Sequence, residues 1–280
     1  MLSVKYREER IHAVKRNRLS RRGFVKQSLK AAGPALLASG ILPLGGEEAT
    51  GEPQARKQLR VVCVGGHPDD PESGCAGTLA RYSDAGHSVT VIYLTRGERG
   101  IRDTPNDEAA RVRSAECEAA CKILGAKPLF AGQIDGSAEF TRPRVDDLLK
   151  LLAAEKPDIL FTHWPIDTHM DHQAASLCAI RSWMALSPRP ELYFFEVNTG
   201  SQTQGFLPNT YVDITAVLEK KKAALFAHRS QDGEGIWRAH HEVIASFRGR
   251  EAGFQAAEAF VHLSRQSPSL PGTAAPATEK

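Results

Sequence analysis

Ten residues, from His163 to His172, combine three histidines with two aspartates in the stretch HWPIDTHMDH. A second cluster, Gly66-His67-Pro68-Asp69-Asp70, lies far upstream. Histidine and aspartate are side chains that bind catalytic zinc, which usually takes three protein ligands and keeps a fourth position open for water. An ion held in this way polarises a carbonyl group and makes water easier to deprotonate. The two clusters together predict the site of a divalent-metal hydrolase.

Both clusters follow short apolar runs that are typical of buried strands. Residues 61–64 (VVCV) end at two glycines before the first cluster, and residues 158–163 (DILFTH) lead into the second. Open α/β sheets bind their ligands outside the carboxyl ends of the strands. Because HPDD alone would also suit a turn, the prediction depends on the pair, which we expect to meet on one rim of one sheet.

Four segments, in order, resemble the successive signatures of the LmbE/PIG-L family of zinc-dependent de-N-acetylases. They are HPDD with the residues after it, RVRSAECEAACKILGA, THWPIDTHMDHQAA, and YVDITAVLEKKKAALFAHRSQ. The resemblance covers residues 59–264. It implies a single-domain, Rossmann-like three-layer α/β/α fold with a largely parallel sheet. It also implies removal of the N-acetyl group from an N-acetylglucosamine-type sugar or conjugate, with release of acetate.

The resemblance assigns the metal site and the base to individual residues. It implies that His67, Asp70 and His172 bind Zn²⁺. It makes Asp69 the general base that takes a proton from the attacking water, a role suited to a carboxylate beside the ion. Ferrous iron would also suit two histidines and one carboxylate.

Four further residues receive roles from the same resemblance. His169 would polarise the acetyl carbonyl or stabilise the oxyanion, and Asp171 lies close enough in sequence to orient that imidazole and favour its charged form. Arg113 and His228 would contact the substrate. For His228 the alternative is that it complements a helix dipole.

Other histidines and arginines have simpler interpretations. His163 could replace a ligand, but at the end of its strand it could instead hydrogen-bond a neighbouring loop. Arg99, in the segment TRGERG, could contact substrate or simply be exposed. We expect His240 and His241 to lie on the surface.

Residues 20–26 (SRRGFVK) form a twin-arginine export signature within a basic segment. The apolar residues that follow, AAGPALLASGILPLGG, are too few and too rich in glycine for a typical membrane span. We therefore expect a signal region at residues 1–46, a linker at 47–58, the deacetylase domain at 59–264 and a flexible tail at 265–280. The twin-arginine translocase would deliver the protein to the periplasm or another extracytoplasmic space, tethered to the membrane if the signal stays uncleaved.

The charge distribution argues against a nucleic-acid partner. Residues 1–46 carry ten Lys or Arg and two Asp or Glu, a net charge of +8 against +3 for the whole chain, which leaves −5 for the rest. A body with excess acid has no basic footprint for nucleic acid. The five cysteines, an odd and scattered set, predict no disulfide framework.

Strand patterns alternate with helical patterns along the domain. The strand patterns are LRVVCVG, SVTVIYLT, KPLFAG, DILFTH, ELYFFEV and TYVDIT; the helical ones include NDEAARVRSAECEAACKIL and DDLLKLLAAEK. This alternation predicts βαβ units with right-handed crossovers. The first strand leads into GGHPDD instead of G-x-G-x-x-G, so a dinucleotide site is not indicated.

Two alternative functions stay open at this level. One is another zinc or iron amidase, because the same ligands could cleave other amides. The other is a carbohydrate-binding protein without turnover. The candidate base Asp69 argues against it, because a binding protein needs no base. The family resemblance also implies that the chain could form a homo-oligomer.

Overall fold

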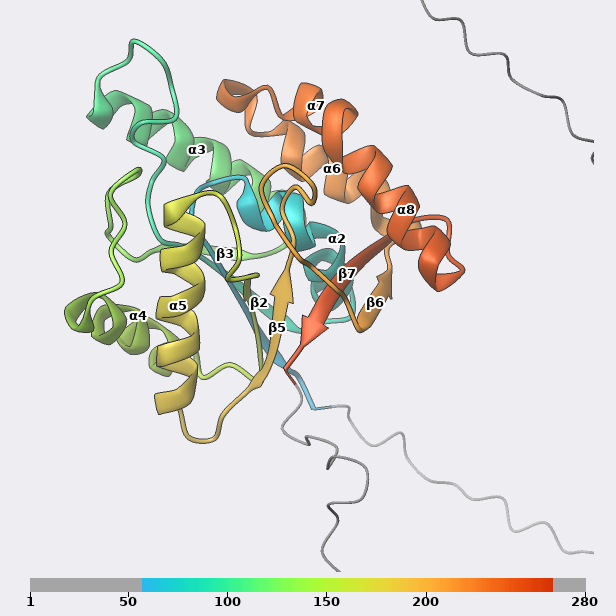
Figure 1. The fold of residues 1–280 in the computed structure, drawn as a ribbon, viewed down its shortest axis with the longest axis horizontal. Coiled ribbons are helices and arrows are strands. Elements are labelled where there is room, and N and C mark those ends of the chain that lie inside the picture. The colour runs from blue at the N-terminus through green and yellow to red at the C-terminus, as the bar shows by residue number, and fades with distance from the viewer. Residues whose placement is uncertain (1–56, 264–280) are drawn as a thin grey trace, which may run out of the picture. The chain divides into compact units, whose positions relative to one another are not determined.

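The computed structural model describes residues 57–263, which form a seven-stranded sheet with helices on both faces (Figure 1). The strands are β1 (Arg60–Gly65), β2 (Ser88–Tyr93), β3 (Lys127–Phe130), β4 (Ile159–His163), β5 (Glu191–Phe195), β6 (Thr210–Asp213) and β7 (Ala257–His262). Their order in the sheet is β3-β2-β1-β4-β5-β7-β6. The first five run parallel, and β7 is antiparallel to both of its neighbours. The predicted α/β class with a largely parallel sheet is confirmed.

Helices cover the two faces of the sheet. The long ones are α2 (Asp70–Asp84), α3 (Asn106–Leu124), α4 (Arg142–Glu155), α5 (Met170–Ala185), α6 (Leu218–Phe226) and α8 (Glu242–Ala252). Short helical turns lie between them: η1 (Thr215–Val217), η2 (Arg229–Gln231), α7 (Gly233–Ile236) and the π-helical η3 (Trp237–His241). In Figure 1, α4 and α5 lie on one side of the sheet and α2, α3 and α6 on the other.

Alternation along β1 explains the two layers. Val61 and Cys63 pack in one core with residues of α2 and α3, whereas Val62 and Val64 pack in a second core with residues of α4 and α5. Successive side chains of a strand point to opposite faces, so an unbroken apolar run indicates a strand buried on both faces. The run VVCV therefore specifies the central position that β1 occupies.

Six of the seven strands correspond to the strand patterns of the sequence, and β7 does not. Its sequence, AEAFVH, contains two alanines and a glutamate, which are poor strand formers. Long-range contacts define this strand instead. Glu258 on β7 accepts hydrogen bonds from the backbone N–H groups of Gly77 (2.9 Å) and Thr78 (2.7 Å) on α2.

A crevice lies between β1 and β4. The chain leaves β1 toward β2 on one side and leaves β4 toward β5 on the other, so the connections diverge where these adjacent parallel strands end. The loop after β1 begins α2, and the loop after β4 begins α5. As expected, the two polar clusters meet here: the Gly66 N–H donates to His163 Nε2 at 3.0 Å.

The twin-arginine signature and the C-terminal tail lie outside the described residues. Within residues 57–263, no helix combines the length and apolar character needed to cross a membrane.

Candidate metal and catalytic site

The first cluster sits where β1 turns into α2. Asp69 directly precedes the helix and has φ of 112°, a backbone conformation that residues other than glycine rarely adopt. The Asp69 N–H donates to Glu72 Oε2 at 3.2 Å, and Ser73 N–H donates to the Asp69 carbonyl at 2.8 Å. These bonds hold a strained residue in place, as is common at functional sites.

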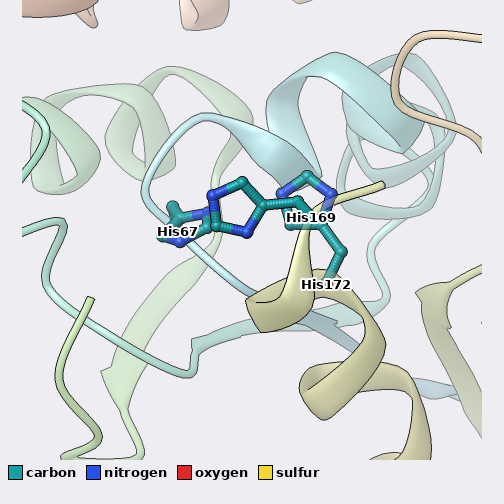
Figure 2. A group of neighbouring side chains, drawn as sticks. All are labelled: His67, His169 and His172. Carbon is teal, nitrogen blue, oxygen red and sulfur yellow. The ribbon is translucent and has the colours of Figure 1, made fainter. Parts of the chain in front are cut away.

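The three residues expected to bind metal lie together. His67 Nδ1 is 3.2 Å from Asp70 Oδ2, and His172 Nε2 is 3.2 Å from Asp70 Oδ1. All three side chains are buried. Figure 2 shows the imidazoles of His67 and His172 beside that of His169, the first from the loop after β1 and the others from the start of α5.

Three groups of side chains could each hold a cation, because the ligand atoms within each group lie within 4.8 Å of one another. The groups are His67, His169 and His172; Asp70, His163 and His172; and His67, Asp135 and Asp171. Although burial alone would raise it, the pKa of Asp70 is held well below its ordinary value by His172 and His163. Burial alone would lower the pKa of His172, but Asp70 and Asp167 outweigh this effect and raise the pKa to about 9. This dense set of donors can hold a divalent cation.

A second layer of carboxylates orients the imidazoles. His172 Nδ1 lies 3.1 Å from Asp167 Oδ1, which leaves Nε2 facing Asp70. On the other ring, His67 Nε2 lies 3.0 Å from Asp171 Oδ2, opposite the nitrogen that faces Asp70. Metal-binding histidines almost always carry such a partner on the second ring nitrogen. This arrangement fits a metal site.

Asp171 contacts His169 through its backbone, whereas its carboxylate faces other partners. Its carboxylate touches His67, and the backbone N–H groups of Gly136 (2.6 Å) and Ala138 (3.2 Å) donate to it. Its backbone N–H, not its side chain, donates to His169 Nδ1 at 3.2 Å. Burial, His67 and His172 lower the pKa of His169, and they outweigh Asp171 and Asp70, which raise it. The Asp171 carboxylate is therefore bound by backbone amides of the loop after β3.

Asp135 is a site residue that the sequence patterns did not single out. Its Oδ1 lies 3.1 Å from His67 Nε2, and Arg99 N–H donates to its Oδ2 at 3.0 Å. It occupies an Asp-Gly turn after the predicted strand KPLFAG. The rule applied to HPDD, polar residues at the carboxyl end of a strand, would have found it.

His163 makes a hydrogen bond to a neighbouring loop and also belongs to one of the three possible ligand triads. Its Nε2 accepts the hydrogen bond from Gly66 described above, and its ring stacks on His172 with centroids 4.3 Å apart. Burial and His172 lower the pKa of His163 to about 4, so the ring is neutral at physiological pH. It supports the loop that carries His67.

Arg113 reaches the base candidate from α3. Its Nη2 lies 2.9 Å from Asp69 Oδ2 and also contacts the Pro68 carbonyl oxygen. Glycines make room for it: a Cβ at Gly97 would stand 2.5 Å from Arg113 Nη1, and Gly100 also lies against it. Burial raises the pKa of Asp69 above its ordinary value, and this effect outweighs Arg113, which lowers the pKa. The segment TRGERG thus positions Arg113 beside the expected base.

His228 does not reach the cavity. It is completely buried, and its Nε2 lies 3.5 Å from Glu72 Oε1, which also accepts a hydrogen bond from the Tyr93 hydroxyl at 2.6 Å. Burial lowers the pKa of His228, but Glu72 and Asp69 raise it above its ordinary value. His228 therefore supports the loop of Asp69 through Glu72, which also accepts a hydrogen bond from the Asp69 N–H.

A cavity of about 530 Å³ opens above these residues. This volume lies within the roughly 300–1,000 Å³ typical of small-molecule sites. It is lined by residues at the starts of α2 and α5 (His67, Asp69, Asp70, Ser73, His169 and His172), residues after β2 and on α3 (Arg99, Gly100 and Arg113), residues after β3 (Asp135 and Gly136), residues after β5 (Val197, Asn198 and Gln202) and residues of the segment from η2 to η3 (Gln231, Ile236, His240 and His241). His241 is only 4% exposed, so the expectation that it lies on the surface is wrong.

Residues 62–183 match the family described as PIG-L, GlcNAc-PI de-N-acetylase. The chain is 30% identical over 217 residues to diacetylchitobiose deacetylase of Thermococcus kodakarensis, covering 71% of this chain and 81% of that protein. It is 29% identical over 185 residues to a probable N-acetyl-alpha-D-glucosaminyl L-malate deacetylase 2 of Bacillus cereus, covering 62% and 84%. The structure of N,N'-diacetylchitobiose deacetylase from Pyrococcus horikoshii, complexed with its inhibitor MPG, aligns with a TM-score of 0.65 and 29% identity, covering 72% and 83%.

Proposed function

The chain belongs to the PIG-L family, and on that basis we propose that it is a metal-dependent hydrolase that removes the N-acetyl group from an N-acetylglucosamine-type sugar or conjugate and releases acetate. The observation that carries the proposal is the position of Asp69. This partly buried carboxylate lines the cavity beside the cluster of His67, Asp70 and His172, and Arg113 contacts it. A general base needs this placement beside the reacting water.

We propose Zn²⁺ as the resident cation, with His67, Asp70 and His172 as its ligands. The carboxylate partners on His67 and His172 support this assignment, because zinc-bound imidazoles usually have such partners. When bound there, the cation supplies Lewis acidity that polarises the acetyl carbonyl and favours deprotonation of water.

Asp69 accepts the proton of the water that attacks the acetyl carbon. Its raised pKa brings it closer to the operating pH, where a general base is most effective. Arg113 fixes the orientation of the carboxylate by its 2.9 Å contact with Oδ2. After the tetrahedral intermediate forms, the same carboxyl group returns the proton to the departing amine, so acetate and the free amino sugar are the products.

His169 stabilises the negative charge that develops on the acetyl oxygen. Because its Nδ1 accepts the N–H of Asp171, the neutral ring carries its proton on Nε2. That nitrogen is the ring's free donor, on a side chain that lines the cavity. A donor aimed at a developing oxyanion is worth about 10²–10³-fold in rate.

Asp135 and Arg99, which both line the cavity, bind the reacting sugar. Asp135 is buried against His67, and Arg99 lies beside Gly136 in the neighbouring loop, where Nη1 donates to the Gly136 carbonyl at 3.4 Å. A carboxylate and a guanidinium together can bind adjacent hydroxyl groups through charge-assisted hydrogen bonds. The 3.1 Å contact between Asp135 and His67 places this carboxylate next to the proposed metal ligands.

The proposal is tested by acetate release. Full-length protein of known metal content is incubated with N-acetylglucosamine and its glycosides, with and without a chelator, and the metal-free protein is then reloaded with Zn²⁺ or Fe²⁺. We expect acetate release that the chelator abolishes and Zn²⁺ restores. Restoration by Fe²⁺ alone would replace zinc with iron, and sugar binding without acetate would indicate a binding protein instead.

Export by the twin-arginine translocase is a second part of the proposal. It is supported by the sequence SRRGFVK at residues 20–26 and would place the enzyme in the periplasm or another extracytoplasmic space. Substitution of both Arg21 and Arg22 by Lys should leave the protein in the cytoplasm of a host with this pathway. Fractionation followed by immunoblotting measures this, and unchanged export of the double variant would contradict the proposal.

A further inference from the structure

One buried carboxylate near the site takes no part in the proposed mechanism. Glu98 lies in the segment TRGERG after β2, is 9% exposed and is not among the residues that line the cavity. Within residues 57–263 it forms no ion pair, and its hydrogen bonds come from the backbone. Glu98 Oε2 accepts the N–H of Arg96 at 3.3 Å and that of Asp135 at 3.1 Å. A buried carboxylate is costly unless it is hydrogen-bonded, so Glu98 and these two amides are held together.

The bond to Asp135 is one half of a reciprocal clamp between two loops. Glu98, after β2, accepts the backbone N–H of Asp135, after β3. In return, the Asp135 carboxylate accepts the backbone N–H of Arg99 at 3.0 Å. The Arg99 guanidinium adds a third bond, from Nη1 to the Gly136 carbonyl. Asp135 and Arg99, the two side chains to which we assign sugar binding, therefore belong to one hydrogen-bonded unit.

The loop that carries Glu98 is itself attached to the loop after β1. The hydroxyl and the backbone N–H of Thr95 both donate to the Gly66 carbonyl, at 3.1 and 3.0 Å. Gly66 precedes His67, and Asp135 Oδ1 lies 3.1 Å from His67 Nε2. These bonds form a closed path from the backbone before His67, through Glu98 and Asp135, to the imidazole. A shift of the Glu98 carboxylate would therefore displace Asp135 relative to His67.

We propose that Glu98 is a positioning residue that places Asp135 and, through it, the reacting sugar. The inference rests on the proposed function, because it concerns how that substrate is held. The length of the side chain carries the effect, since its oxygen must reach the Asp135 N–H. The negative charge is not required, because an amide oxygen accepts the same hydrogen bonds.

Substrate affinity should depend on Glu98 more than the chemical step does. Asp171 Oδ2 also lies 3.0 Å from His67 Nε2, so this contact would keep the imidazole in place if Asp135 moved. No second contact of this kind replaces the bond between Glu98 and the Asp135 N–H within residues 57–263. A displaced Asp135 should therefore raise KM and leave kcat nearly unchanged.

Two substitutions separate the length of the side chain from its charge. Glu98→Asp keeps the charge but withdraws the oxygen by one methylene group, whereas Glu98→Gln keeps the length and removes the charge. Zinc-loaded, full-length variants are assayed for acetate release from N-acetylglucosamine. We expect Glu98→Asp to raise KM about tenfold, the effect of one lost hydrogen bond to a charged group, with kcat within about threefold of the parent. Glu98→Gln should keep both constants within about threefold.

A double-mutant cycle tests whether Glu98 acts through Asp135. Asp135→Ala should raise KM at least as much as Glu98→Asp does, and combining the two should add nothing further. Arg96→Ala is the matched control, because Arg96 lies on the same loop and its exposed guanidinium lies over the Phe130 ring, 5.3 Å from the centroid. Its KM should equal that of the parent. Should Glu98→Asp not fold, a raised KM in Glu98→Gln would contradict the role of length.

A binding measurement separates failure of this inference from failure of the proposed function. The Kd of N-acetylglucosamine for the metal-free proteins, measured by calorimetry, needs no turnover and should follow the same order as KM. Parental KM and Kd in Glu98→Asp, a larger effect of Glu98→Gln, or additive losses in the double variant would overturn the positioning role while the parent still released acetate. If the parent released no acetate, the proposed function would fail, and the Kd values would still decide whether Glu98 places Asp135. Absence of both acetate and binding would overturn the two together.

Discussion

Asp69 combines a strained backbone with a partly buried carboxylate. Its φ of 112° turns the chain from β1 into α2 so that Asp69 and Asp70, adjacent in sequence, can serve as base and ligand. The strain, of order 1–3 kcal/mol, persists only where surrounding contacts fix it. Here these are Glu72 on its N–H and Arg113 on its carboxylate. Residues that touch no substrate should therefore affect catalysis.

Gly97→Ala tests the space reserved for Arg113. Gly97 has φ of +70°, and the new Cβ would lie 2.5 Å from Arg113 Nη1, so the guanidinium must move away from Asp69. We expect kcat to fall about tenfold to a hundredfold, since small misplacements of catalytic groups cost this much. Gly86→Ala is the control: its φ is +83° and its Cβ would meet nothing within 4 Å. Equal activity of the two variants would contradict the role of Arg113.

His228→Leu separates a supporting role from substrate contact. The substitution leaves the buried Glu72 without its cationic partner, so the free energy of unfolding should fall by about 3 kcal/mol. KM for the substrate should change less than twofold. Denaturant unfolding and steady-state kinetics measure both quantities. A large rise in KM at unchanged stability would restore the family-based assignment to substrate binding.

The sequence alone was sufficient to identify the three candidate metal ligands but not the carboxylates that orient them. The motifs identify His67, Asp70 and His172 because ligand chemistry needs those residue types at strand ends. The partner of each imidazole depends on loops distant in sequence. Asp171 follows His169 closely, yet its carboxylate turns to the amides of Gly136 and Ala138, and no local pattern encodes that choice.

At the scale of elements, the crevice depends on the pairing of β1 with β4. Asp158, just before β4, accepts hydrogen bonds from Arg60 N–H at 2.9 Å and from Arg60 Nε at 3.1 Å. These bonds tie the amino ends of both central strands. Their carboxyl ends, where His67 follows β1 and His163 ends β4, are thereby held in register.

Asp158→Asn should produce a pH-dependent loss of stability. Hydrogen bonds from Arg60 hold the pKa of Asp158 below its ordinary value of 3.8 in the folded protein. A lowered folded pKa stabilises the protein above the unfolded pKa, about 3.9, and this contribution is lost as the pH falls through the folded pKa. Unfolding of the metal-free protein should show the deficit of the variant at pH 7 and its decline below about pH 4.

Glu118→Gln is the control for removal of one negative charge, because Glu118 is exposed on α3 and makes no hydrogen bond or ion pair within residues 57–263. A deficit of Asp158→Asn that stays constant down to pH 2 would show that the carboxylate charge is not its cause.

Most elements could be predicted because their patterns are local. The pattern NDEAARVRSAECEAACKIL matches α3 residue for residue, ended by Gly125 in the left-handed conformation. The strand β7 could not be predicted in this way, because its position between β5 and β6 depends on long-range pairing. The burial of His241 could not be predicted from the sequence either, because a π-helical turn changes the helical period at this residue.

At the scale of the whole molecule, one buried ion pair joins three elements. Lys221 on α6 pairs with Glu258 on β7 and donates to the Ser73 carbonyl on α2 at 2.7 Å. Both charged side chains are almost fully buried. Because α2 begins at Asp70, this pair connects the C-terminal part of the domain to the catalytic loop.

Lys221→Met should destabilise the protein by about 3–5 kcal/mol, because it leaves Glu258 charged and without its cationic partner. Adding Glu258→Gln removes that charge, so the double variant should recover part of the loss. Denaturant unfolding of both single variants, the double variant and the parent measures the coupling. Additive losses in the double variant would contradict a direct interaction between the two charges.

The most direct test of the account compares acetate release by Asp69→Asn with that of the parent protein at matched zinc content. Asp69 lines the cavity but is not among the proposed ligands, so we expect unchanged zinc and a rate reduced by about 10²–10⁴-fold, the contribution of a general base. A variant with full zinc and a rate within a few-fold of the parent would contradict the proposed chemistry.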